Sequence, residues 1–171
     1  MRHTEDVSPP QPQPPTIVLY SDGACLGNPG AGGYAAILTY GDHRRELSGG
    51  FRLTTNNRME LMGAIKGLEA LKRPCAVTLV SDSEYLVNSL RKGWAAAWRA
   101  QGWKRKGKVV PNADLWTELL TLADRHRVTV EWVRGHAGHV ENERCDLLAT
   151  AAAAANPQDV DVGYETRPSL S

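Results

Sequence analysis

Two aspartates stand directly after short apolar runs. Asp22 follows TIVLYS (16–21), and Asp82 follows AVTLVS (76–81). Continuous runs of this kind are typical of strands buried on both faces of a sheet. If the two strands are parallel neighbours, their ends lie about 4.8 Å apart, at the carboxyl edge where α/β folds bind ligands. Two carboxylates held this close repel each other unless a proton or a cation lies between them.

Two further acidic residues fall on predicted helices. Apolar residues recur every three to four positions over 57–72, which predicts a helix with Glu60 in its first turn. Asp146 lies on a second helix, predicted over 141–155. Four carboxylates that converge on one edge of a sheet would make a hard-oxygen site suited to Mg²⁺ or Mn²⁺.

Each acidic residue also has a purely structural interpretation. Asp22 precedes a glycine and could form a turn, and Asp82 could cap a helix that starts at residue 83. Asn57 and Glu60 have the spacing of a capping box, which alone would explain the glutamate. Asp146 could be an exposed helix residue. The sequence leaves these alternatives open for each residue taken singly.

Positive charge is concentrated in residues 91–108, which include no acidic residue. Because the whole chain carries +1 and this segment +7, the rest of the chain carries −6. A phosphate-binding surface needs such a concentration of charge. Trp94 and Trp98 are four apart and share a helix face, and Trp103 follows, although core packing is the alternative for all three. The basic residues are Arg91, Lys92, Arg99, Lys104, Arg105, Lys106 and Lys108.

The elements that must position these residues follow the order of an α/β protein. The first three strands predict an antiparallel meander, with Gly41 and Asp42 in the second turn. Helical crossovers then place the fourth and fifth strands parallel to the first. We expect a mixed five-stranded sheet flanked by helices. The predicted strands are 16–21, 33–40, 44–51, 76–81 and 128–134, and the predicted helices are 57–72, 83–100 with a break at Gly93, 114–127 and 141–155.

Length and composition are those of one globular domain. The chain has 171 residues, of which 42% are hydrophobic and 23% charged, and this excludes a mostly disordered protein. Residues 1–15 hold five of the ten prolines and predict a disordered tail. We expect the folded domain over 16–156 and a second flexible tail over 157–171.

Three cysteines without short spacing argue against a disulfide framework or a zinc knuckle. Free thiols fit a reducing cytosol. The N-terminal segment lacks the apolar core of a signal peptide, and no apolar run approaches the roughly 18 residues that span a bilayer. We therefore expect a cytoplasmic protein with no membrane association, and a monomer, since nothing in the sequence demands an oligomer.

Five segments form an ordered set of motifs: SDGACLGNPGAGGYAAIL, TTNNRMELMGAI, LVSDSEYL, GWAAAWRAQGWK and VRGHAGHVENERCDLLA. In this order they resemble type 1 ribonuclease H, the bacterial ribonuclease HI group, over nearly all of residues 17–155. The resemblance implies the ribonuclease H-like fold, in agreement with the topology above. It also implies an endoribonuclease that hydrolyses the RNA strand of RNA/DNA hybrids with Mg²⁺ and leaves 5′-phosphate and 3′-hydroxyl ends.

The resemblance assigns the family's metal-binding carboxylates to Asp22, Glu60, Asp82 and Asp146. It makes Asp22 the ligand that bridges two ions, while Glu60 and Asp82 complete one site and Asp146 the other. Two metals about 3.5–4 Å apart can clamp the attacking and leaving oxygens of a phosphodiester. We expect two Mg²⁺ ions, for which Mn²⁺ substitutes.

The resemblance also assigns a catalytic role to His136, which assists the attacking water or the departure of product. Gly135 and Ala137-Gly138 flank it, so its loop can move. An unperturbed histidine titrates near about 6.5 and can transfer protons at neutral pH. The alternatives are a cap on the last helix and a zinc site with His139, which lacks a third soft ligand nearby.

Contacts with the hybrid are implied for three groups of residues. In the minor groove, where the 2′-hydroxyl distinguishes RNA from DNA, the resemblance places one cysteine and three asparagines; helix capping is the alternative for the asparagines. A neutral phosphate pocket and a basic protrusion would hold the DNA strand. The implied residues are Cys25, Asn28, Asn56 and Asn57 in the groove, Asn28 and Thr55 in the pocket, and Trp94, Trp98, Lys104, Arg105, Lys106 and Lys108 on the protrusion.

Two residues depart from close relatives. Leu53 stands where the phosphate pocket has an arginine, and Arg52 would point to the opposite side of an extended segment. Glu84 stands where a neutral amide is common. Both departures concern substrate affinity rather than the reaction.

Two other function classes compete with the hybrid-specific endoribonuclease. A catalytically idle hybrid-binding module would need a broken carboxylate set, but all four acids are present. Another nuclease or an integrase on the same fold would leave the basic segment and the TTNNRMEL motif unexplained.

Overall fold

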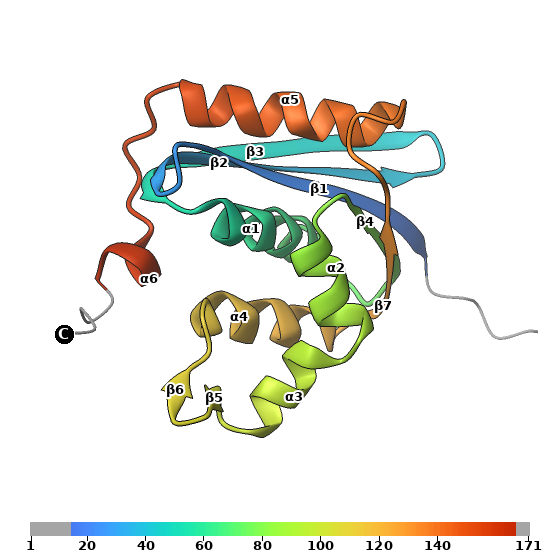
Figure 1. Cartoon of the computed structure of the whole chain (residues 1–171). Coiled ribbons are helices and arrows are strands. Elements are labelled where there is room, and N and C mark those ends of the chain that lie inside the picture. The colour runs from blue at the N-terminus through green and yellow to red at the C-terminus, as the bar shows by residue number, and fades with distance from the viewer. Residues whose placement is uncertain (1–14, 167–171) are drawn as a thin grey trace, which may run out of the picture.

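The computed structural model describes residues 15–166, in which five strands form one mixed sheet with the order β3-β2-β1-β4-β7 (Figure 1). The first three strands form an antiparallel meander, β4 pairs parallel to β1, and β7 pairs parallel to β4. The expected α/β fold is therefore confirmed. The strands are β1 (Thr16–Leu26), β2 (Gly30–Tyr40), β3 (His43–Thr54), β4 (Ala76–Ser81) and β7 (Arg127–Trp132).

Helices cover both faces of the sheet. Figure 1 shows α5 on one face, α1 on the other, and α4 beyond α1. Within the described part of the chain, no helix has both the length and the hydropathy needed to cross a membrane. The helices are α1 (Asn56–Glu69), α2 (Glu84–Arg91), α3 (Trp94–Ala100), α4 (Ala113–Ala123), α5 (Val140–Ala154) and α6 (Val162–Glu165).

The register between β1 and β4 aligns the two aspartates. The parallel ladder ends at the pair Tyr20↔Val80, so Asp22 and Asp82 each stand two residues beyond it. β1 itself continues to Leu26 by pairing with the glycine-rich start of β2. The predicted strand stops at residue 21, before these glycines, whereas the structure uses Gly23 for close packing against α1.

Two cores hold the layers together. The larger core lies between the sheet and the helices of the α1 side, and it buries Leu19, Ile65 and Trp116 completely. A smaller core under α5 includes Ile37 and Ala149. Full burial of an aliphatic side chain contributes about 1.5–3 kcal/mol, so these contacts fix the positions of α1 and α5 against the sheet.

Charged side chains also attach α5 to β3. Arg44 pairs with Glu46 at 2.7 Å and with Glu141 at 2.9 Å, and Arg144 pairs with Glu46 at 2.8 Å. Hydrogen bonds from Arg144 and Arg44 lower the pKa of Glu46 to about 2. This network links the first two turns of the helix that carries Asp146 to β3.

The segment between β4 and β7 is more divided than predicted. Gly93, with φ of 74°, separates α2 from α3 as expected. A two-stranded ribbon, β5 (Lys104–Arg105) and β6 (Lys108–Val109), was not predicted. Its turn has positive φ at both Lys106 and Gly107, which suits the twist of a tight hairpin.

The C-terminal segment requires a correction to the expected flexible tail over 157–171, because residues 157–166 pack on the domain. Asp161 is only 3% exposed and pairs with Arg58 at 2.7 Å, while Glu165 pairs with Arg52 at 2.9 Å. Polar composition predicts a loose tail, but here the polar groups are the anchors. The expected N-terminal tail lies outside the described residues except for Pro15, whose carbonyl accepts from the Ala76 N–H.

Gly33 sets the approach of α5 to the sheet. A Cβ at this position would collide with the backbone of Ala149 and Ala153. We expect Gly33→Ala to lower the free energy of unfolding by about 1–3 kcal/mol, the usual cost of overpacking. Denaturant unfolding measures this, with Ser48→Ala, exposed on β3, as a control that should change little. Equal stability of the two variants would contradict the close approach.

Candidate active site

Three of the four predicted carboxylates meet at the carboxyl edge of the sheet. Carboxylate oxygens of Asp22, Glu60 and Asp82 lie within 4.8 Å of one another. Asp22 is 3% exposed and Glu60 6% exposed, whereas Asp82 is half-buried. The cluster therefore joins β1, α1 and the end of β4 in a largely dry position.

Glycine allows α1 to come this close. A Cβ at Gly23 would collide with the backbone of Met59 and Glu60, so only a glycine lets the first turn of α1 rest against β1. The Gly23 N–H also donates to Asp22 Oδ1 at 2.9 Å. Gly23 thus orients the Asp22 carboxylate through its N–H and leaves room for Glu60 to approach it.

The capping alternatives for Glu60 and Asp82 do not hold. Thr55, not Asn57, caps α1, by accepting from the Arg58 N–H. Ser83, not Asp82, caps α2, by accepting from the Leu86 N–H. Because other side chains cap both helices, capping explains neither the position of Glu60 nor that of Asp82.

The electrostatics of the cluster favour a bound cation. Burial, followed by the charges of Asp82 and Asp146, raises the pKa of Asp22 to about 8. Burial and the charges of Asp22 and Asp82 raise the pKa of Glu60 well above its usual value. Among the described residues, Glu60 Oε2 is buried without a hydrogen-bond partner. A divalent ion would supply both the missing partner and the missing charge, so these residues fit a divalent metal site.

Asp146 stands beside this cluster rather than inside it. The residue is half-buried on α5, and its charge contributes to the raised pKa of Asp22. It does not join the group of three whose oxygens lie within 4.8 Å in the described structure. The predicted fourth ligand therefore faces the cluster from the opposite layer of the fold.

The loop after β7 rests on Asp82. A Cβ at Gly135 would lie 2.9 Å from Asp82 Oδ2. His136 is exposed and adopts a left-handed conformation, with φ of 58°. The residue at the N-cap of α5 is His139, and its side chain makes no capping bond. His136 is thus free of the capping role and lies one residue from the glycine that contacts the cluster.

Sequence reasoning missed a neighbour of Asp82. Trp132, at the end of β7, donates its Nε1–H to the Asp82 carbonyl at 3.2 Å and is 42% exposed. Its place at the end of the strand next to β4 was a signal that could have indicated this contact.

Predicted groove residues gather around the start of α1. Asn28 Oδ1 accepts from the Asn56 N–H at 3.2 Å. The Cys25 thiol lies 3.5 Å from the carbonyl oxygens of Gly30 and Thr54. Asn57 is exposed. This arrangement brings polar groups of the β1–β2 turn and of α1 to one surface beside the carboxylates.

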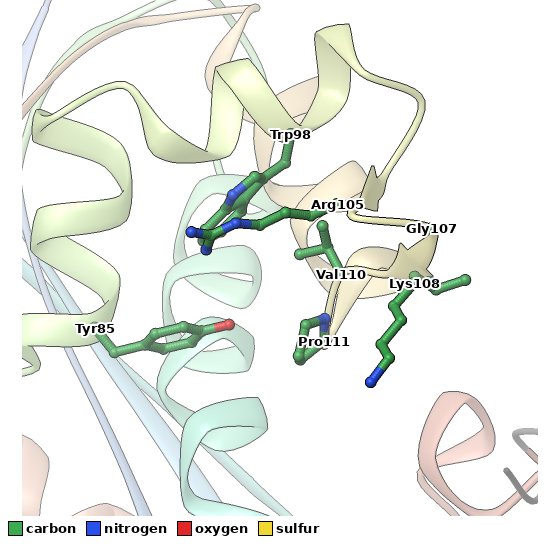
Figure 2. A pocket seen from close by; sticks show the side chains of 8 residues that line it. Tyr85, Trp98, Arg105, Gly107, Lys108, Val110 and Pro111 are labelled. Atoms are coloured by element: carbon green, nitrogen blue, oxygen red, sulfur yellow. The ribbon is translucent and has the colours of Figure 1, made fainter.

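The basic segment forms a protrusion with two hollows. One, of about 800 Å³, lies between α2, α3 and the β5–β6 ribbon (Figure 2). A second, of about 660 Å³, is lined by both Trp94 and Trp98. Trp98 also packs edge-on against the buried Trp116, with ring centroids 6.0 Å apart, so it belongs to the core and to the surface. Residues around the first hollow include Tyr85, Trp98, Arg105, Lys108, Val110 and Pro111.

Comparison with known proteins identifies relatives along most of the chain. The RNase H family model matches residues 14–154. A ribonuclease H of Syntrophus aciditrophicus (strain SB) is 60% identical over 149 residues, which cover 86% of each chain. A ribonuclease HI of Synechocystis sp. (strain ATCC 27184 / PCC 6803 / Kazusa) is 54% identical over 153 residues, covering 88% of this chain and 96% of the relative.

A solved structure agrees with these relatives. The crystal structure of LC9-RNase H1, a type 1 RNase H with the type 2 active-site motif, is 34% identical, with a TM-score of 0.76, and the match covers 92% of this chain and 82% of that one. Since the family match spans all five strands of the sheet and all four predicted carboxylates, the chain belongs to the RNase H family.

Proposed function

We propose that this protein hydrolyses the RNA strand of RNA/DNA hybrids internally, with two divalent metal ions, and leaves 5′-phosphate and 3′-hydroxyl ends. The observation that carries the proposal is the buried cluster of Asp22, Glu60 and Asp82, which has one carboxylate oxygen unpaired among the described residues. Membership of the RNase H family supports the same reaction.

The metal ligands would be Asp22, Glu60, Asp82 and Asp146, which would together hold two Mg²⁺ ions. When bound, the ions would activate water and stabilise the departing oxygen, and Mn²⁺ would substitute. The role of the chain is to hold the carboxylates in a dry position, where burial and mutual repulsion raise the pKa of Asp22 and Glu60 and so favour a cation.

His136 would move a proton to or from the water or the leaving oxygen. His136 is exposed and has a left-handed backbone. It follows Gly135, the residue of the same loop that lies against Asp82. A group that transfers protons to solvent must reach both the reacting phosphate and bulk water, and an exposed loop position supports both.

Two surfaces would recognise the two strands. Cys25, Asn28, Asn56 and Asn57 would contact the minor groove near the RNA 2′-hydroxyls. Thr55 accepts from the Arg58 N–H, which leaves its hydroxyl proton for a DNA phosphate.

The protrusion would hold the DNA strand further along the duplex. Cations would neutralise phosphates, and the indoles of Trp94 and Trp98, which line one hollow, would pack on deoxyribose rings. The cations are Lys104, Arg105, Lys106 and Lys108. We further propose a cytoplasmic monomer, in keeping with the free thiols of Cys25, Cys75 and Cys145.

The deciding experiment is cleavage of an end-labelled RNA/DNA hybrid with and without Mg²⁺, with duplex RNA and duplex DNA as controls. Cleavage of the RNA strand of the hybrid alone supports the proposal. Binding without cleavage would favour an idle hybrid-binding module, and cleavage of duplex DNA would favour another nuclease on this fold.

Asp22→Asn tests the cluster. Cleavage should be abolished while hybrid binding is retained. In EDTA the variant should melt higher than the wild type, because the folded-state pKa of Asp22, about 8, exceeds the ordinary value of 3.8. A raised pKa destabilises the fold increasingly as pH rises from about 4 to 8, so the gain should be small near pH 4 and full near pH 8. Near-normal Mg²⁺-dependent activity would remove Asp22 from the mechanism.

Neutralising the protrusion tests DNA-strand binding. Changing Lys104, Arg105, Lys106 and Lys108 together to glutamine should raise KM far more than it lowers kcat. Each lost phosphate contact should flatten the dependence of log K on log salt by about 0.9 for a duplex, and by less for contacts to a flexible strand. A salt slope equal to that of the wild type would mean that the segment is only a solvated surface.

Leu53→Arg tests the neutral phosphate pocket. Leu53 is 38% exposed near the end of β3. Its neighbour Arg52 is held away from the phosphate pocket by its ion pair with Glu165. A rim charge in water contributes about 1 kcal/mol, so restoring it should lower KM about fivefold, with a smaller gain at higher salt.

KM at two salt concentrations, together with a melting curve, checks this prediction. A lower melting temperature without any gain in affinity would mean that Leu53 packs against α1 instead.

Glu84, exposed in the first turn of α2, offers a companion variant, because Glu84→Gln removes a carboxylate near the hybrid and should also lower KM.

A further inference from the structure

We propose that Arg58, held by Asp161 and Asp114, is a positioning residue that fixes the basic protrusion relative to the carboxylate cluster. The inference rests on the proposed function, because it assigns the two surfaces to the two strands of one hybrid.

Arg58 has every donor of its guanidinium in use. Nε and one Nη donate to Asp161 at 2.7 and 2.9 Å, both Nη atoms donate to Asp114 at 2.7 and 2.8 Å, and one reaches Asn112 Oδ1 at 3.5 Å. These five contacts match the five N–H groups of an arginine. A planar fork with all donors engaged has one orientation, which lysine could not reproduce.

The three partners come from two parts of the chain. Asp161 belongs to the C-terminal segment and also accepts from the Thr54 hydroxyl at 2.7 Å. Asn112 is the N-cap residue of α4, through which the chain leaves the protrusion, and Asp114 lies in the first turn of that helix. Arg58 itself lies two residues before Glu60 on α1. One buried side chain therefore joins the helix of the metal cluster to the base of the protrusion.

The base of the protrusion is tied in a second way. Asn112 Nδ2 donates to the Tyr85 hydroxyl at 3.2 Å, and Trp116 Nε1 donates to the same oxygen at 2.8 Å. Tyr85 lines both hollows of the protrusion. Asn112 therefore contacts both Arg58 and Tyr85, which lines the same hollows as Trp98 and Arg105.

Because the Arg58–Asp161 pair is buried, it constrains geometry more than it adds stability. The side chains of Arg58 and Asp161 are 4% and 3% exposed. A buried ion pair gives little net stability over an apolar packing of equal volume, because desolvation offsets the attraction. It does disfavour separation of Arg58 from Asp161, since that would leave a buried charge unpaired. A duplex that contacts the cluster with one strand and the protrusion with the other needs that fixed separation.

Asp161→Asn provides the test, because it keeps the shape of the side chain and removes its charge. The Kd of a fluorescently labelled hybrid, measured in EDTA at a temperature where the variant is folded by circular dichroism, should rise about fivefold. KM should rise equally, while kcat stays within twofold. Asp114→Asn, at a residue whose side chain is 47% exposed, should act in the same direction with less risk to folding.

Arg52→Gln is the matched control. It breaks the exposed 2.9 Å ion pair with Glu165 in the same C-terminal segment and leaves Arg58 untouched. Its Kd should stay within twofold of the wild type. An increase equal to that of Asp161→Asn would show that general loosening of the C-terminal segment is responsible, and would overturn the proposal.

Coupling to the protrusion is the sharpest readout. In a protein with glutamine at 104, 105, 106 and 108, Asp161→Asn should raise Kd less than twofold. Most of the positive charge that the substitution would displace relative to the DNA phosphates has already been removed. Equal effects in both backgrounds, or a lower melting temperature with an unchanged Kd, would overturn the positioning role. Failure of the wild-type protein to cleave hybrid would instead overturn the proposed function, while the binding comparison stays valid.

Discussion

Repulsion among buried carboxylates is the constraint around which this molecule is organised. Asp22 and Glu60 are almost fully buried, lie within a few ångströms of Asp82, and have raised pKa values because burial and like charge oppose ionisation. No isolated segment would adopt such an arrangement. The rest of the fold must therefore provide enough favourable packing to hold the charges together until a cation neutralises them.

The packing that does so acts from three directions. The ladder between β1 and β4 sets Asp22 level with Asp82, and the apolar face of α1 presses Glu60 against Gly23. On the other face, α5 carries Asp146 and is attached to β3 by Arg44 and its partners. The sheet contributes two acids and α1 one, so the cluster exists only where the sheet and α1 meet, and α5 adds the charge of Asp146 beside it.

Positive charge is concentrated in the protrusion and not spread evenly along the chain. The protrusion carries its cations on a ribbon beyond α3, while the remainder of the chain is net negative. Concentrating positive charge away from the carboxylates keeps them available for metal ions and still offers the phosphate backbone a favourable surface. Arg58 is a cation on α1 itself, two residues before Glu60, and Asp161, Asp114 and Asn112 engage its guanidinium.

The sequence by itself determined the antiparallel meander, the two strands parallel to the first, the main helices and the candidate carboxylates, because buried apolar runs and helical periodicity are local patterns and the family motifs lie within them. It also indicated the break at Gly93 and the basic segment. Only the tertiary structure decided that Thr55 and Ser83 cap the helices in place of the acids, that Trp132 and Gly135 contact Asp82, and that Asp161 is buried against Arg58. Each cap joins residues only three apart, whereas the contacts of Asp82 and of Asp161 join residues far apart in the chain. The polarity of residues 157–166 resembles that of a loose tail until a buried partner is found. A local sequence pattern indicates which face of a helix or strand is buried. The partner that a side chain contacts, and its distance, depend on how the layers pack.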